Sequence, residues 1–467
     1  MDKYKRLMSN TFIFALGTFS SKLLVFFMMR FYTGVLSDEA YGMADIIVQT
    51  CNLLIPIASV GIINAVIRFG LERGIDKKSV FTTSLVVILL GFCGLLCFSP
   101  LLNRLDFLQG YLVYLYCFIF TSSMQGLCSQ FVRAKGLVKL YAIDGVYQTV
   151  MTVVLNIVLM GPCKLGVPGY LLSTILTDFS SFMLLIWLVR LDKYIDFSKI
   201  KASLTKQMLK YSIPMIPNTI STWIINMSSR YLILYMINEG ATGIYAVANK
   251  IPTLMIIIAN IFGDAWQISA VTDSKQTRQQ FFSQVADVYQ SIAFLMASAL
   301  IMVTQMVIKI LAAPEFFEAW RCMPILVMAT TFACLASFLS SVYMVEKRSN
   351  YIMATTMIGA AINLGLSFFL IPIFGLNGAA VATFVSYFTM FVIRFIHTQT
   401  FIRIRWHGLK LGLNFIMIIA QAYIILNELY LWPLWEILLF GASLALNSKA
   451  LLLTLNKLGL GRLIRPH

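Results

Sequence analysis

Four basic residues stand inside long apolar stretches of this sequence: Lys22 and Arg30 within residues 9–36, Arg230 within 211–237, and Lys250 shortly afterwards. Stretches of this length can cross a bilayer, where an ion costs several kcal/mol unless it is solvated or paired. Guanidinium groups bind phosphate bidentately, and ammonium groups bind it as point charges. The four side chains are therefore candidates for a cationic lumen that binds an anionic cargo.

A structural alternative for these cations is snorkelling, in which a long stem carries the charged head to the membrane interface. It suits Arg30 and Arg230, because both lie a few residues from the end of their stretch. Lys22 lies about thirteen residues, or about 20 Å, from either end of its stretch, which is farther than a lysine stem reaches. Lys22 is therefore expected to face water or a charged partner.

Three acidic residues, Asp178, Asp264 and Asp287, lie in or beside apolar stretches. They are candidates for countercharges of the lumen cations or for a site that binds a coupling H⁺ or Na⁺. A paired or interface-facing carboxylate is the simpler interpretation and is favoured. Asp45 and Asp144 lie near expected helix starts, where a carboxylate complements the helix dipole, and need no further role.

Polar side chains also gather in the stretch that holds Arg230 and in the one after it. They are candidates to line a cavity and bind sugar hydroxyls, with the tryptophan stacking on a sugar ring. Polar packing between membrane helices explains them equally well. These residues are Asn218, Trp223, Asn226 and Asn249.

The composition indicates which elements carry these side chains. The 467 residues are 59% hydrophobic and only 12% charged, which is typical of an all-α polytopic membrane protein. At about 20 apolar residues per span, the sequence predicts about fourteen transmembrane helices joined by short connections. Their approximate centres are Lys22, Pro56, Leu90, Phe120, Leu155, Met183, Ile224, Met255, Ala297, Thr331, Ala361, Phe384, Ile418 and Leu444.

The placement of positive charge predicts the orientation. Most lysines and arginines cluster on every second connection, whereas the opposite connections hold only Arg104, Lys164, Lys309 and Arg321. The positive-inside rule makes the richer side cytoplasmic, and an even number of crossings leaves both termini there. The net charge of +16 is thus explained by topology, and no nucleic-acid partner is expected.

An internal repeat supports the helix count. Gly166 and Gly169 align with Gly375 and Gly378, each pair as a G-x-x-G that turns one helix into the next. Earlier in each half, residues 37–47 pair with residues 238–248. The repeat unit is about six helices, an even number, so the two copies keep one orientation about an axis along the membrane normal.

The repeat predicts the domain boundaries. We expect an N-lobe of six helices over residues 1–190, a basic cytoplasmic linker over 191–206, and a C-lobe of six helices over 207–405. The linker is a candidate interfacial helix. Residues 406–467 supply two further helices and a basic cytoplasmic tail.

The order and spacing of several short motifs resemble the multidrug/oligosaccharidyl-lipid/polysaccharide (MOP) exporter superfamily. Within it, the chain is similar to polysaccharide-biosynthesis flippases such as those for O-antigen and lipid II. The motifs are SDEAYG at 37–42, YSIPMIP at 211–217, residues 223–230, GIYAVANKIP at 243–252 and INLGLSFFLIPIFGLNGAA at 362–380. The resemblance implies two six-helix lobes around a central cavity that opens alternately to each side, plus two C-terminal helices.

One departure from the family pattern concerns the residue before Arg230. The family often has an aspartate there, and this chain has Ser229. The resemblance therefore assigns no local countercharge to Arg230, and a proton or sodium role cannot be carried over to this position.

The resemblance implies a flippase that moves an undecaprenyl-pyrophosphate-linked glycan from the cytoplasmic to the outer leaflet of the plasma membrane. Surface or capsular polysaccharide export, including O-antigen of lipopolysaccharide, is the favoured role. A lipid II flippase is the alternative. Expected partners are the lipid bilayer and a polysaccharide polymerase or glycosyltransferases, and no cofactor is expected beyond a coupling H⁺ or Na⁺.

Two other classes of protein fit the sequence less well. A cation-coupled multidrug exporter of the same superfamily is disfavoured, because the first helix carries Lys22 and Arg30 but no acid. A membrane enzyme needs a catalytic constellation, and the three histidines at 397, 407 and 467 have none beside them. No metal cluster or nucleotide-binding loop is visible, so a transporter is expected and an enzyme is not.

Overall fold

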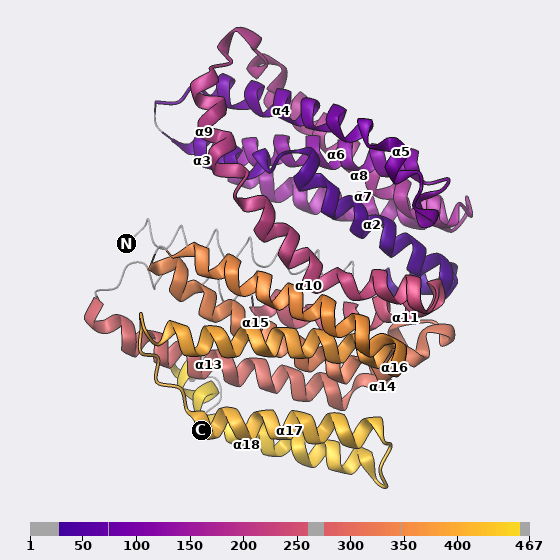
Figure 1. Cartoon of the computed structure of the whole chain (residues 1–467), viewed down its shortest axis with the longest axis vertical. Helices are drawn as coiled ribbons and strands as arrows, with labels where there is room; N and C mark the ends of the chain where they lie inside the picture. The colour runs from indigo at the N-terminus through magenta and orange to yellow at the C-terminus, as the bar shows by residue number, and fades with distance from the viewer. Residues whose placement is uncertain (1–27, 73, 260–274, 347, 458–467) are drawn as a thin grey trace, which may run out of the picture. The chain divides into compact units, whose positions relative to one another are not determined.

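A computed structural model of the chain describes residues 28–72, 74–259, 275–346 and 348–457, and all regular structure in these residues is helical (Figure 1). Lys22 and Asp264 lie outside the described residues. The α-helices are α2 (Asp38–Ala58), α3 (Ile62–Leu71), α4 (Lys77–Cys97), α5 (Ser99–Leu102), α6 (Leu112–Ala134), α7 (Val138–Met160), α8 (Gly166–Val189), α9 (Ala202–Ser212), α10 (Met215–Met236), α11 (Glu239–Lys250), α13 (Lys275–Met302), α14 (Thr304–Leu311), α15 (Met323–Val345), α16 (Ser349–Thr398), α17 (Gly408–Leu426) and α18 (Trp432–Lys457). Short 3₁₀ helices are η1 (Asp106–Leu108), η2 (Leu191–Tyr194), η3 (Phe197–Lys199) and η4 (Pro314–Arg321).

The helices confirm the predicted polytopic membrane fold. Among the described residues, 10 segments are long and apolar enough to cross a membrane by length and composition. One of them, Asn350–Thr398, runs through Gly375, whose φ of 57° and ψ of −135° divide α16 into two helices. Every predicted helix centre that falls on a described residue lies in a helical segment.

The repeated glycines adopt matching conformations. Gly166 and Gly375 have φ values of 56° and 57°, in the left-handed region that side chains rarely enter. Three residues on, a Cβ would lie 3.2 Å from the Leu159 carbonyl oxygen at Gly169 and 2.2 Å from that of Leu370 at Gly378. The prediction that each G-x-x-G turns one helix into the next is confirmed.

The described helices form two compact units. The first runs to Trp223 and adds Glu239–Gly243, whereas the second contains Ile224–Asn238 and Ile244 onward. The division falls inside α10. The lobe boundaries drawn from the repeat therefore stay a prediction, because α10 supplies one part to each unit.

The predicted linker over 191–206 is folded against the first unit. Its 3₁₀ turns η2 and η3 cover the start of α4, where Thr82 Oγ1 donates to the Tyr194 carbonyl at 2.9 Å and accepts from the Asp196 N–H at 2.9 Å. Ser79 Oγ donates to the Lys199 carbonyl at 2.7 Å. The Ser198 side chain and N–H hold the pKa of exposed Asp196 below its usual range.

The second unit includes the helical hairpin of α17 and α18, which packs along α13 (Figure 1). Phe332 of α15 lies at the centre of a cluster of aromatic rings that α16 and α17 complete through Phe388, Phe391 and Phe415. Through Phe415, α17 thus contributes to the aromatic core of this unit, and α18 packs on α13 and α17.

Candidate functional site

The structure places the described lumen cations in different environments. Arg30 is exposed on the helical turn over residues 28–35, Lys250 is half-buried at the end of α11, and Arg230 is only 5% exposed in α10. Arg30 belongs to the first compact unit, and Arg230 and Lys250 belong to the second. Their joint role, like that of Lys22, stays a prediction.

Arg230 is enclosed by its own unit. Its guanidinium interacts electrostatically with Tyr245 of α11, a fully buried residue whose hydroxyl lies 3.4 Å from Thr383 Oγ1 of α16. Because the side chain is surrounded by protein, it does not extend to a membrane interface. Snorkelling therefore does not explain Arg230, whereas it remains open for exposed Arg30.

The residues before Arg230 form a buried hydroxyl and amide network. Ser228 Oγ donates to Asn363 Oδ1 at 2.7 Å, and the hydroxyls of Ser229 and Ser367 lie 3.0 Å apart. Asn363 Nδ2 continues the network to Thr383 Oγ1 at 3.3 Å. Where the family often has an aspartate, this chain thus has a neutral serine pair that joins α10 to α16.

The predicted polar residues differ in the hydrogen bonds that their side chains form. The Trp223 indole N–H donates to the Gln49 carbonyl at 2.9 Å. Asn226 Oδ1 accepts from the Tyr387 hydroxyl at 2.5 Å, and Asn249 Nδ2 donates to the Tyr245 carbonyl at 2.8 Å. The Asn218 side-chain oxygen has no partner among the described residues.

A buried carboxylate in α7 lies at the centre of a second network. Asp144 is 2% exposed and accepts from Ser181 Oγ at 2.6 Å, Gln148 Nε2 at 2.8 Å and Gln125 Nε2 at 3.1 Å. It stands well inside α7, so the helix-dipole interpretation from the sequence is wrong. The spacing of Asp144 and Gln148, one helical turn apart, was the signal for an inward-facing polar pair.

Asp178 of α8 lies beside this network. It is half-buried, accepts a short hydrogen bond from the Ser122 hydroxyl, and interacts electrostatically with Asp144. The first unit therefore contains two neighbouring carboxylates with hydroxyl and amide partners. The second unit has Arg230 beside a neutral network.

Asp287 of α13 is a countercharge for Lys410, which is not one of the four predicted lumen cations. Its Oδ1 lies 2.9 Å from Lys410 Nζ and 3.5 Å from His407 Nδ1, both at the start of α17. Lys410 also donates to Ser291 Oγ at 2.8 Å. These contacts hold α17 to α13. Among the described residues, no group of three or more His, Cys, Asp or Glu side chains could hold a metal ion.

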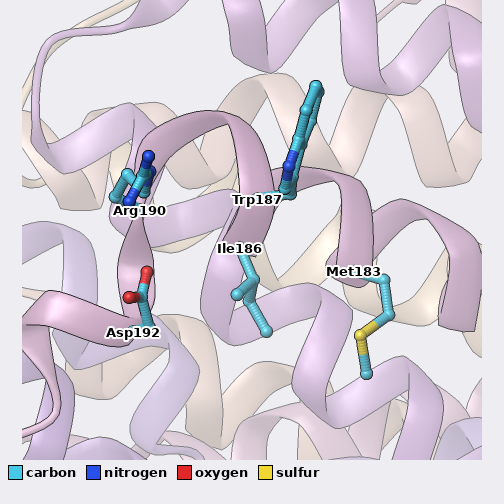
Figure 2. A pocket seen from close by; sticks show the side chains of 5 residues that line it. All are labelled: Met183, Ile186, Trp187, Arg190 and Asp192. Atoms are coloured by element: carbon cyan, nitrogen blue, oxygen red, sulfur yellow. The ribbon is translucent and has the colours of Figure 1, made fainter.

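A cavity of about 480 Å³ lies where α8 ends (Figure 2). Met183, Ile186 and Trp187 come from the last turns of α8, and Arg190 and Asp192 follow in the turn after it. None of the predicted site residues lines it. Tryptophan and arginine side chains are common where a membrane helix meets the interface, which suits this position.

These observations define the class of protein: a multi-pass helical membrane protein with buried charged and polar side chains in its spans. The sequence matches the family described as polysaccharide biosynthesis protein over residues 7–266. The chain therefore belongs to this family. No curated protein matches the chain.

Solved structures share the fold at low sequence identity. The inward closed conformation of the lipid II flippase MurJ matches with a TM-score of 0.72 and 12% identity, covering 96% of this chain and 99% of that one. An inward-facing multidrug resistance MATE family transporter of the MOP superfamily matches with a TM-score of 0.65 and 15% identity, covering 82% of this chain and 95% of that one. A MOP superfamily transporter from Pyrococcus furiosus matches with a TM-score of 0.60 and 12% identity, covering 84% of this chain and 95% of that one. The predicted MOP exporter fold is confirmed.

Proposed function

We propose that this protein is a flippase, not an enzyme, that moves a polyprenyl-pyrophosphate-linked oligosaccharide from the cytoplasmic to the outer leaflet of the plasma membrane by alternating access. The observation that carries the proposal is the match to polysaccharide biosynthesis proteins over residues 7–266. That range contains all four lumen cations, Lys22, Arg30, Arg230 and Lys250. The product would be a surface or capsular polysaccharide, such as an O-antigen.

The chemistry of the cargo fits the cations. A pyrophosphate joins the lipid tail to the sugars, and guanidinium groups bind phosphate through paired charge-assisted hydrogen bonds. Burying Arg230 in a membrane helix costs several kcal/mol, which favours a functional role over a packing role. In this proposal Arg230 binds the pyrophosphate when the lobe moves, and Arg30, Lys22 and Lys250 extend the anion path.

The polar residues of α10 and α11 are proposed to bind the sugars. An indole ring suits stacking on a sugar, and the hydrogen bond from the Trp223 N–H to the Gln49 carbonyl fixes the orientation of the ring. The Asn218 oxygen suits a sugar hydroxyl, since no described residue donates to it. Asn226 and Asn249 each form a hydrogen bond within the protein, which would position their amide groups for the cargo.

Substitution of Arg230 tests the cargo site. Arg230→Ala is expected to reduce surface glycan about tenfold or more, because a charge-assisted contact is worth roughly 1.5–3 kcal/mol. Glycan export is measured in cells that depend on this chain, with membrane insertion checked by quantitative immunoblotting. Arg104→Ala removes an exposed arginine of a connection and is the matched control. Normal export by Arg230→Ala would contradict the proposal.

The energy source is proposed to be a cation, H⁺ or Na⁺, that binds at Asp178. Asp144 already accepts from three donors, whereas the described contacts of Asp178 supply one hydroxyl. Two adjacent carboxylates repel each other when both are charged, which favours neutralisation of the less satisfied one. Asp178→Asn is therefore expected to make glycan export insensitive to collapse of the H⁺ or Na⁺ gradient. If export by this variant still responds like wild type, Asp178 is not the coupling site.

A lipid II flippase is the second candidate, because the MurJ structure covers 96% of this chain. Complementation separates the two cargoes. Rescue of cells depleted of their lipid II flippase favours lipid II, whereas rescue of cells that lack an O-antigen or capsule flippase favours a surface polysaccharide. Efflux of cationic dyes would instead favour a multidrug exporter. A polymerase or glycosyltransferase partner is proposed on the same grounds, and copurification with this chain tests it.

A further inference from the structure

Three fully buried polar side chains meet where the α17–α18 hairpin packs on α13. They are Ser298 of α13, Gln421 of α17 and Glu436 of α18, each 0% exposed. Gln421 Nε2 donates to Glu436 Oε2 at 2.8 Å and to the Ser298 carbonyl oxygen at 3.3 Å. One amide group therefore uses both of its donors to link three helices.

The other oxygen atoms of these side chains have no partner among the described residues: Glu436 Oε1, Gln421 Oε1 and Ser298 Oγ. If Glu436 is ionised, its second oxygen and the amide oxygen are both acceptors and cannot bond to each other. A protonated carboxyl has an O–H group, which can donate a hydrogen bond to an amide oxygen. The hydrogen-bonding capacity of the pair is thus completed by one proton.

The charged side chains that the structure describes around the hairpin do not offer Glu436 a cation. On α13, Asp287 is paired with Lys410, about 16 Å along the helix from Ser298 at 1.5 Å per residue. Tyr289 donates to the Cys334 carbonyl oxygen at 3.1 Å. In the turn before α18, Glu428 accepts from Gln305 Nε2 at 3.4 Å.

Among the described side chains near the hairpin, the remaining titratable groups also give Glu436 no charged partner. Tyr423 of α17 and Tyr430 of the turn are exposed, and His407 lies beside Asp287 at the far end of α17. A buried carboxylate with no cation costs several kcal/mol when ionised. The neutral form of Glu436 is therefore the stable one.

We propose that Glu436 is a proton-binding site in the C-terminal hairpin. The carboxylate takes up one H⁺ on Oε1, and that O–H donates to Gln421 Oε1 while Gln421 Nε2 donates to Oε2. The result is a cyclic carboxyl–carboxamide pair that fastens α18 to α17 and, through the Ser298 carbonyl, to α13. Loss of the proton places two acceptors opposite each other and loosens the hairpin.

The test compares the wild-type protein with Glu436→Gln by infrared spectroscopy of the full chain in lipid vesicles. Glutamine supplies an NH₂ donor in place of the carboxyl O–H, so this variant imitates the protonated form. We expect a carboxylic acid carbonyl band in the wild type at pH 6 that is absent from Glu436→Gln. Glu428→Gln, in the exposed turn of the same hairpin, is the control and keeps the band. A spectrum without this difference would overturn the proposal.

Thermal unfolding in detergent gives a second readout that does not depend on transport. Because the folded state holds the proton, stability is present at low pH and is lost as pH rises. The wild-type Tm is expected to fall by about 3 °C or more relative to Glu436→Gln at high pH. Sodium chloride should not restore it beyond choline chloride at equal concentration. Restoration by Na⁺ in the wild type alone would assign the site to sodium and refute proton binding.

Discussion

Two neighbouring carboxylates of the first unit differ in how fully their oxygens are satisfied, and this difference predicts different responses to amide substitution. In Asp144→Asn, three hydrogen bonds to a carboxylate are replaced by weaker bonds to a neutral amide. The amide oxygen takes the place of Oδ2, which accepts from Gln125 and Gln148, and the NH₂ group takes the place of Oδ1, so the Ser181 hydroxyl must turn to accept. We expect the free energy of unfolding to fall by about 2 kcal/mol, measured by thermal unfolding in detergent. Asp178→Asn should cost less, because the described contacts of Asp178 supply one donor, the Ser122 hydroxyl, where Asp144 has three.

Asp192→Asn, in the exposed turn after α8, controls for loss of a negative charge and is expected to leave the Tm unchanged. Equal losses for Asp144→Asn and Asp178→Asn would contradict the description of Asp144 as the more fully bonded carboxylate.

At the residue scale, the sequence identified which charges are unusual but not their partners. The apolar stretch around Arg230 predicts a charge inside a membrane helix, and the structure buries it. The partners of Asp287 and Asp144 lie on other helices, 123 residues away at Lys410 and 37 away at Ser181. A single sequence carries no signal for such pairings, because they depend on which helix faces pack together.

At the element scale, a pair of repeat-related glycines forms a close helix crossing. A Cβ at Gly42 of α2 would lie 2.3 Å from the Glu239 carbonyl oxygen, and one at Gly243 of α11 would lie 2.0 Å from that of Asp38. The sequence paired these positions as equivalents in the repeat. The structure adds that the two helix starts touch each other within the first compact unit.

Gly243→Ala is therefore expected to force the two backbones apart and lower the free energy of unfolding by about 2 kcal/mol. Gly94→Ala in α4 is the matched control, since a Cβ there meets open space and alanine favours a helix by about 1 kcal/mol. Thermal unfolding in detergent measures both. A Gly243→Ala protein as stable as Gly94→Ala would show that the crossing tolerates a side chain.

Element positions were largely predictable because membrane helices are long and apolar, and the G-x-x-G motif marks a turn that needs positive φ at Gly166 and Gly375. The fold of residues 191–206 was not predictable in the same way. Its basic composition indicates a cytoplasmic segment, whereas its 3₁₀ turns depend on hydroxyl groups of Ser79 and Thr82 more than a hundred residues away.

At the scale of the whole molecule, the compact units do not follow the repeat boundary. The division at Trp223 and Ile224 lies within α10, because the start of that helix packs with the first unit. A repeat found in the sequence reports common ancestry of two halves, whereas packing decides which helices form one body. The lobes over residues 1–190 and 207–405 thus stay predictions from the sequence repeat, whereas the compact units show which helices pack together.

The orientation in the membrane can be tested with a native cysteine. Cys163 is exposed in the turn between α7 and α8, on the side that the positive-inside rule makes extracytoplasmic. The other exposed cysteines, Cys93, Cys97 and Cys117, lie in α4 and α6 and are replaced by serine in the background protein, because Cys97 is the last residue of α4.

A membrane-impermeant maleimide added to intact cells is therefore expected to label this background protein and to leave its Cys163→Ser variant almost unlabelled. Each transmembrane helix takes the chain to the opposite side of the membrane. The side on which the turn between α7 and α8 lies therefore determines the side of every other connection. Labelling that appears only after the membrane is permeabilised would place Cys163 in the cytoplasm. The clusters of lysine and arginine, and with them both termini, would then face outward, and the proposed direction of glycan transport would have no structural support.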